Sequence, residues 1–74
     1  MEFDEEVLLG MKKSRRTYKV VVAPTETQEE RVFYGRVVRY NLEHRVITLE
    51  NEKGTALICF DEIRRVFSDK TRRY

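Results

Sequence analysis

The chain has one histidine, His44, and one cysteine, Cys59, the two side chain types most often used as nucleophiles, bases or metal ligands. Protein metal sites normally take three or four ligands, and no second histidine or cysteine is present to join either residue. We therefore interpret His44 as a solvated turn residue. Cys59 alternates with Ile58 and Phe60, so we expect it to point away from the core as a buried structural thiol rather than a nucleophile. A lone cysteine forms no intrachain disulfide, which is typical of a reducing, cytoplasmic setting.

Asp61 and Glu62 form a pair of adjacent carboxylates near the end of the chain. Two carboxylates perform acid–base catalysis only when both face one cleft, and neighbouring positions usually diverge. We instead predict a structural role, in which the Asp61 carboxylate accepts backbone N–H bonds in a tight turn between the last two strands. On these grounds we expect the chain not to be an enzyme and to use no metal or cofactor.

The third chemistry is recognition of phosphates and bases by cations and aromatic rings. Basic residues gather in two groups, within 12–19 and within 64–73, and several tyrosines lie between them in sequence. The candidate contacts for nucleic acid or a protein partner are Lys12, Lys13, Arg15, Arg16, Lys19, Tyr34, Tyr40, Arg64 and Arg65.

Two other interpretations of the basic residues stay open. The 15 bases are nearly balanced by 13 acids, so the cations can equally form a solvated face with salt bridges to Glu26, Glu29 and Glu30. The same charges can also contact a protein partner. The distribution is uneven along the chain, because residues 1–10 carry four acids and no base while residues 11–20 carry five bases and no acid.

Length and composition predict one small folded domain. The chain has 74 residues, of which 41% are hydrophobic and 38% charged, so it can form a thin core with a heavily solvated exterior. Such a core is marginal, and a partner or a second copy would stabilise it. No run of about 18 apolar residues occurs and the start is acidic, so we expect neither a membrane span nor a secretory signal.

The elements that would position these groups begin with a helix. Phe3, Val7, Leu8 and Met11 recur at helical spacing, which predicts a helix over residues 3–11 with Gly10 and basic residues near its end. It is too short to stand alone and should pack on the rest of the domain.

Strands follow the helix. Residues 17–23 are β-branched and aromatic and end before Pro24, which cannot donate to a strand ladder. Residues 31–40 form the longest predicted strand, in which Gly35 indicates a bend or bulge. Its two faces are both apolar, one with Phe33, Gly35 and Val37 toward the core, and one with Val32, Tyr34, Val38 and Tyr40. We expect the helix to cover part of the second face and to leave a tyrosine accessible.

The second half of the chain predicts a hairpin and a corner. Residues 45–50 and 55–60 are strands joined by a four-residue loop at 51–54, where Gly54 supplies a positive φ. The tetrapeptide Phe60, Asp61, Glu62 and Ile63 is a structural corner that leads into a short last strand over 64–67. We expect the tail at 68–74 to be frayed.

This order of elements resembles the small Sm-like barrel. The segments Gly35 to Asn41 and Arg45 to Leu49 are similar to the first Sm signature, and the corner Ile58 to Ile63 is similar to the Ile-Pro-Phe-Asp-Asp-Ile ending of the YolD-like family. The resemblance covers about residues 18–67. It implies a mainly β fold, a five-stranded bent antiparallel Sm-like barrel at 17–67, with a short helix and basic arm at 1–16 and a basic tail at 68–74. Asn41 replaces the usual acidic residue of the Sm signature, and the second Sm signature is absent, so the Sm uridine pocket is not carried over.

The resemblance to the YolD-like family also implies a function. Its members are associated with DNA-damage responses and error-prone polymerases of bacteria and phages, so we expect a non-enzymatic adaptor that binds a protein of nucleic-acid metabolism. The alternatives are direct binding of RNA or single-stranded DNA and a phage-encoded inhibitor of a host or defence protein. Self-association is a further alternative, in which residues 55–60 pair with the last strand of a neighbour.

Overall fold

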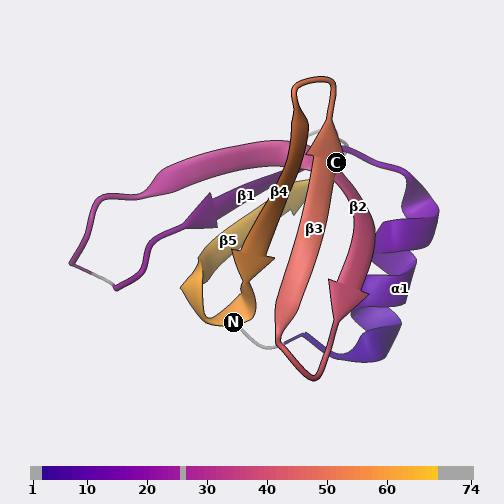
Figure 1. Cartoon of the computed structure of the whole chain (residues 1–74), viewed down its shortest axis with the longest axis horizontal. Coiled ribbons are helices and arrows are strands. Elements are labelled where there is room, and N and C mark those ends of the chain that lie inside the picture. Colours follow the sequence, from indigo (N-terminus) through magenta and orange to yellow (C-terminus); the bar gives the residue numbers. More distant parts are fainter. Residues whose placement is uncertain (1–2, 26, 69–74) are drawn as a thin grey trace.

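One antiparallel sheet of five strands and one short helix make up the fold (Figure 1). The structure is a computed structural model and describes residues 3–25 and 27–68. The elements in chain order are α1 (Glu5–Ser14), β1 (Tyr18–Val22), β2 (Arg31–Asn41), β3 (Val46–Asn51), β4 (Gly54–Cys59), the 3-10 turn η1 (Phe60–Glu62) and β5 (Ile63–Ser68). The mainly β fold with a short N-terminal helix predicted from the sequence is confirmed.

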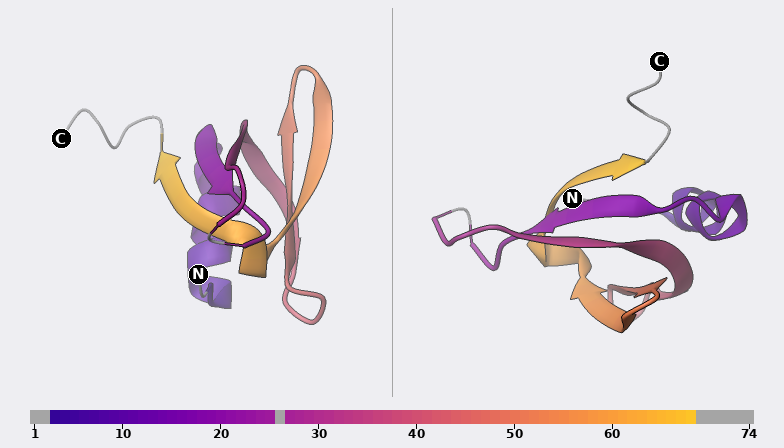
Figure 2. Two further views of the ribbon diagram at one scale, coloured as in Figure 1. Left: turned by 90° about the vertical axis from the view of Figure 1, so that its left-hand side faces the viewer. Right: turned by 90° about the horizontal axis from the view of Figure 1, so that it is seen from above.

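Strand β2 is shared between the two halves of the sheet. Its first half pairs with β1, with Tyr18 opposite Gly35, and its second half pairs with β3, with Arg36 opposite Glu50. The strand therefore changes partner between Gly35 and Arg36, and Figure 2 shows how it curves there. The predicted bend at Gly35 coincides with this exchange of partners.

Gly35 is required where the backbones approach most closely. A Cβ atom at this position would lie 2.8 Å from the carbonyl oxygen of Glu50, a backbone atom that cannot move without shifting β3. We expect Gly35→Ala to lower the free energy of unfolding by about 1–3 kcal/mol, the range typical of an overpacked site. Urea denaturation followed by circular dichroism measures this loss. Gly10→Ala is the matched control, because a Cβ there meets nothing within 4 Å, and an equal effect of the two substitutions would contradict the account.

The sheet is bent but not closed. Its strand order is β4-β3-β2-β1-β5, so β4 and β5 are the two edges and no pairing between them closes a barrel within the described residues. The five bent antiparallel strands agree with the sequence prediction, and among the described residues the sheet stays open between β4 and β5. Closure would need β4 to reach β5, and these strands are joined by the single short turn η1.

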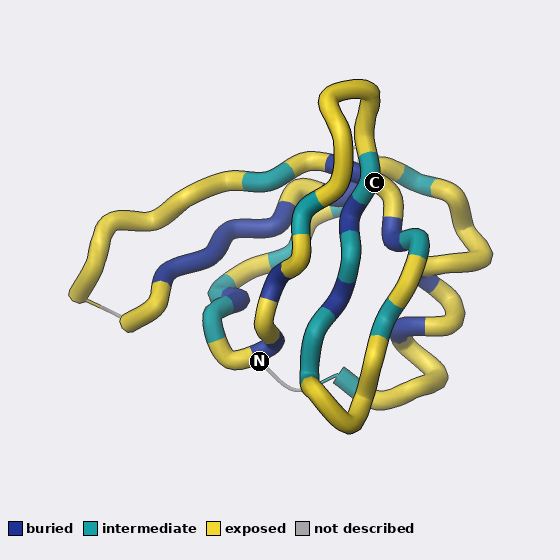
Figure 3. The backbone as a smooth tube through the Cα atoms, in the orientation of Figure 1, coloured by how far each residue is buried: buried dark blue, intermediate teal, exposed yellow. Residues whose placement is uncertain are grey.

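The core lies on the concave side of the sheet. Val20, Val37, Ile47 and Leu49 are at most 2% exposed and come from three strands. The remaining members of this cluster are Leu8, Met11, Tyr18, Val22, Ile58, Phe60 and Ile63. The predicted core positions Phe33 and Val37 face this cluster, and the helix closes it on one side (Figure 3).

The helix runs later in the chain than the predicted 3–11. The Asp4 side chain accepts a hydrogen bond from the Val7 N–H at 2.9 Å, which caps the first turn and starts the helix at Glu5. Arg15 adopts a left-handed conformation and ends it. Phe3 therefore lies before the helix, where its ring packs 5.2 Å from that of Phe60.

Several local predictions need correction. The loop between β3 and β4 has two residues rather than four, because Asn51 and Gly54 form the last pair of the ladder; Gly54 does have a positive φ of 134°. Cys59 points away from the core as predicted but is exposed, not buried. Ser68 belongs to β5 and pairs with Tyr18, while the rest of the predicted tail lies outside the described residues. His44 is exposed in the turn after β2.

The carboxylate at the corner is bound by a cation. Phe60 and Ile63 are each 1% exposed, whereas Asp61 and Glu62 are not buried. The Asp61 carboxylate accepts a hydrogen bond from the Arg45 guanidinium at 2.9 Å, so the predicted bonds to backbone N–H groups of the turn are wrong. Arg45 also lies over the Phe60 ring, 5.6 Å from its centroid. One arginine thus secures both the buried and the exposed side of the corner.

Candidate nucleic-acid interface

The convex surface of β2, β1 and β5 carries a row of three side chains. Lys19 on β1 lies opposite Tyr34 on β2 and opposite Phe67 on β5. Directly opposite residues of antiparallel strands project from the same face. The neighbouring rows, which contain Val20 and Tyr18, face the core. Tyr34, Lys19 and Phe67 therefore project together to the outside, and we call this row the aromatic row.

The aromatic row is open to solvent. Tyr34 is 55% exposed and Phe67 is 41% exposed. Lys19 between them is also exposed. Two aromatic rings on adjacent strands of one face, with a cation between them, form a surface on which planar groups can stack.

Lys19 is held against one of the rings. Its ammonium nitrogen lies 5.5 Å from the centroid of the Phe67 ring, within the range of a cation–π contact. Such a contact at an exposed site is weak, about 0.5–1 kcal/mol. The flexible lysine chain can exchange the ring for a phosphate oxygen at small cost, and this movement would uncover the ring.

A second row lies beside the aromatic row. Val21 pairs with Val32 on one side and with Arg65 on the other. Val32 is 44% exposed, whereas Val21 between its neighbours is 3% exposed. The Arg65 guanidinium donates to the Glu30 carboxylate at 2.8 Å. One of the predicted basic contacts is therefore already paired with an acid, as the salt-bridge interpretation of the sequence expected.

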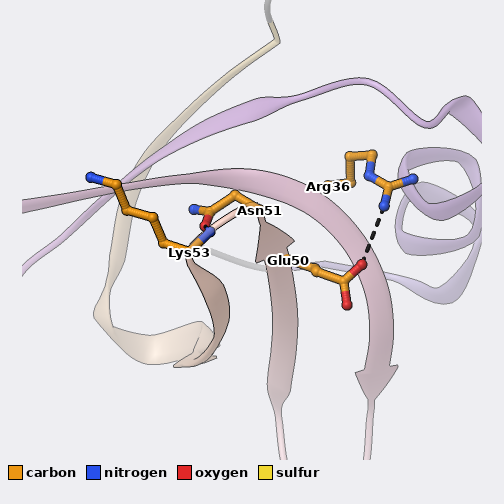
Figure 4. Close-up of polar contacts among 4 residues, drawn as sticks. All are labelled: Arg36, Glu50, Asn51 and Lys53. Atoms are coloured by element: carbon orange, nitrogen blue, oxygen red, sulfur yellow. Dashed lines mark hydrogen bonds and ion pairs between the residues drawn. The ribbon is translucent and has the colours of Figure 1, made fainter.

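A shallow groove continues the aromatic row toward the β3–β4 hairpin. It is lined by Thr17, Tyr34, Gly35, Arg36, Glu50, Asn51, Glu52 and Lys53. Figure 4 shows Arg36 and Glu50 joined across β2 and β3, at 3.2 Å, with the Lys53 side chain extending away from this pair. Asn51 donates to the Tyr34 carbonyl and accepts from the Lys53 N–H, which fixes the hairpin against β2.

The basic arm enters the same end of the sheet. Lys12 and Lys13 are exposed in the last turn of α1, and Arg15 is exposed at its C-cap. Arg16 precedes Thr17, which lines the groove beside Tyr34. The arm therefore brings positive charge along the chain to within a few residues of the aromatic row.

Two predicted contacts lie elsewhere. Tyr40 is half-buried against the core and its hydroxyl donates to the Glu5 carboxylate at 3.5 Å. This contact shows that the helix covers this end of β2, as expected. Desolvation and the Glu5 charge raise the pKa of Tyr40 above its ordinary value. The Arg64 guanidinium donates to the Ala23 carbonyl at 2.8 Å and is part of the packing between β5 and the end of β1. Neither side chain belongs to the aromatic row.

The structure thus brings together Lys19, Tyr34 and Arg65 from the predicted set. Phe67 was not among the residues predicted from the sequence. The signal was present in the chain, since Lys19 is the one charged residue in an otherwise apolar and aromatic strand. Only the register of β1 with β5 shows that Phe67 stands beside it.

The described residues hold no cluster suited to a metal ion. Within residues 3–25 and 27–68, no group of three or more histidine, cysteine, aspartate or glutamate side chains converges. Nor does any helix of this part of the chain have the length and apolar character needed to cross a membrane. Comparisons of the chain with protein-family models, curated proteins and solved structures gave no match.

Proposed function

We propose that this chain is a non-enzymatic binding module whose aromatic row binds single-stranded nucleic acid. The observation that carries the proposal is the register that places Lys19 between the exposed rings of Tyr34 and Phe67. Each ring supports stacking of one base, and the lysine supports contact with the intervening phosphate.

Single strands suit this surface better than duplexes. Stacking on a side chain requires bases that are not already stacked within a helix. The nearby acids Glu30 and Glu50 neutralise Arg65 and Arg36, so the face lacks the dense positive charge with which proteins hold a duplex backbone. Lys19 on the row, Lys53 in the adjoining groove and the basic arm supply positive charge for contact with a single strand.

The proposal is tested by the salt dependence of binding. A fluorescein-labelled ten-nucleotide strand should bind with an affinity that falls as salt rises, with a logarithmic slope of about −0.7 for each phosphate contact. We expect Lys19→Ala to make the slope shallower by about 0.7, and Arg15→Gln with Arg16→Gln to weaken binding at every salt concentration. Arg39→Gln is the control, since it removes the same charge from β2 beyond the bend.

Fluorescence anisotropy gives these affinities between 0.05 and 0.3 M salt, values within the range where counterion release dominates. An affinity that did not change with salt, or an equal effect of Lys19→Ala and Arg39→Gln, would contradict the assignment. A duplex of the same length that bound as tightly as the single strand would also overturn it.

The role of adaptor for a protein of nucleic-acid metabolism is the second candidate. It is supported by the resemblance to the YolD-like family and by one observation, the uncharged edge strand β4. Gly54–Cys59 contains no charged residue, and its Leu57 is 74% exposed. Edge strands of monomeric proteins are usually guarded by charges or proline, so an unguarded edge favours a partner.

A second copy of the chain is the other partner that open edges admit. Pairing of β4 with the β5 strand of a neighbour would give self-association. Sedimentation equilibrium distinguishes the two cases, because a mass of 8.9 kDa leaves the β4 edge for a different protein. A multiple of this mass assigns the edges to copies of the chain.

A further inference from the structure

A second groove lies on the opposite side of the bend in β2 from the β3–β4 hairpin, which adjoins the aromatic row. It runs between β4 and the segment where β1 ends and β2 begins. Figure 1 shows this segment extending from the body of the domain. The groove has a volume of about 760 Å³. Its lining residues are Val22, Pro24, Gln28, Glu29, Glu30, Arg31, Phe33, Leu57, Ile58 and Glu62.

We propose that this groove binds an extended segment of another protein in which apolar residues alternate with lysine or arginine. Val22 and Ile58 form a buried floor, and Phe33 is half-buried beside them. The apolar side chains of an added strand would lie on this floor, because successive side chains of a strand point to opposite faces.

The edge of β4 supplies the main-chain partners for such a segment. β4 pairs with β3 on one side, and its other side is an edge of the sheet. A strand that adds to this edge gains backbone hydrogen bonds without requiring any particular sequence. Leu57, on the outer face of β4, would then be covered by the alternate side chains of the same segment, which explains its present exposure of 74%.

The charges of the groove select a basic occupant. Three carboxylates, those of Glu29, Glu30 and Glu62, line it together with the single cation Arg31. Glu30 is bound to Arg65, so Glu29 and Glu62 remain to attract lysine or arginine. The same carboxylates repel a phosphate backbone, which separates this groove from the aromatic row in the class of ligand.

A second copy is a poor source of this segment. The basic and apolar strand of the chain itself is β5, and its two arginines are already engaged in their own domain. Arg64 donates to the Ala23 carbonyl and Arg65 to the Glu30 carboxylate, both at 2.8 Å. Each arginine would have to leave its own partner before it could reach the groove of a neighbour.

Labelled peptides test the proposal directly. We expect a nine-residue peptide that alternates valine and lysine to bind about tenfold more tightly than one that alternates valine and glutamate, because two ion pairs of ordinary surface strength separate them. N-methylation of alternate peptide nitrogens in the valine–lysine peptide should abolish binding, since it removes the donors that pair with β4. Fluorescence anisotropy with the full chain measures all three.

Variants of the chain locate the site. Glu29→Gln with Glu62→Gln should weaken the valine–lysine peptide by about tenfold. Leu57→Lys should also weaken it, because it places a like charge beside the lysine side chains that lie over Leu57. The control double variant Glu6→Gln with Glu43→Gln removes the same charge elsewhere and should leave the affinity unchanged, as should Lys19→Ala on the aromatic row. Equal binding of the basic and acidic peptides, an unaffected Glu29→Gln and Glu62→Gln variant, or self-association that excludes the peptide would overturn the proposal.

Discussion

Replacing Phe60 with alanine is expected to lower the free energy of unfolding by about 3–5 kcal/mol, the usual cost of removing a buried aromatic side chain. Phe60 is 1% exposed and lies at the centre of the corner between β4 and β5. Its ring contacts that of Phe3 and lies beneath the Arg45 guanidinium. Its backbone N–H donates to the Arg45 carbonyl at 2.8 Å, so the ring and the backbone anchor the same turn.

The loss is large relative to the whole domain. A chain of 74 residues has a free energy of unfolding of about 4–11 kcal/mol. Phe60→Ala therefore removes about a quarter or more of it, and the variant should be partly unfolded near 37 °C. Urea denaturation at 25 °C gives the difference directly.

A matched control separates burial from general sensitivity. Leu57→Ala truncates a side chain on the same segment that is 74% exposed, and we expect a change of at most about 0.5 kcal/mol. A Phe60→Ala variant that lost less than about 1 kcal/mol would show that the corner is not packed as described.

The second large effect concerns ligand binding. Replacing both Tyr34 and Phe67 with alanine should weaken binding of a single-stranded oligonucleotide by at least about 30-fold, since stacking of each base contributes about 1–3 kcal/mol. Both side chains are exposed, so the fold should survive their loss. The same anisotropy titration used for the salt dependence measures the change.

The control for this pair keeps the amount of apolar surface removed comparable. Leu42→Ala with Leu57→Ala truncates two exposed apolar side chains away from the aromatic row. We expect it to bind the oligonucleotide as the unaltered chain does. If both double variants lost affinity equally, the aromatic row would not be the binding surface.

The strands were predictable because their alternation is strong. Phe33 and Val37 point to the core as their period of two requires, and Ile47 and Leu49 do the same on β3. The bend followed from Gly35, whose missing side chain permits the close approach of β2 and β3. These are local features, and local features can be inferred from neighbouring residues.

The predictions that failed depend on contacts between distant segments. The partner of Asp61 is Arg45, sixteen residues earlier, and no pattern around the corner indicates that pairing. The neighbours of Lys19 depend on two strand registers, one of which joins β1 to the last strand of the chain. The predicted bounds of the helix were wrong because the Asp4 cap and the left-handed conformation of Arg15 set its two ends.

Binding of single-stranded nucleic acid at the aromatic row is tested most directly by a map of amide chemical shifts. The shifts are followed in the ¹⁵N-labelled chain as a single-stranded ten-nucleotide oligonucleotide is added. We predict that the largest shifts fall on the adjoining positions of β1, β2 and β5, at Lys19, Tyr34 and Phe67, with smaller shifts in the basic arm. Shifts confined to β3 and β4, or to the groove beside Leu57, would contradict it. An absence of shifts at a high concentration of oligonucleotide would show that the chain does not bind single-stranded nucleic acid.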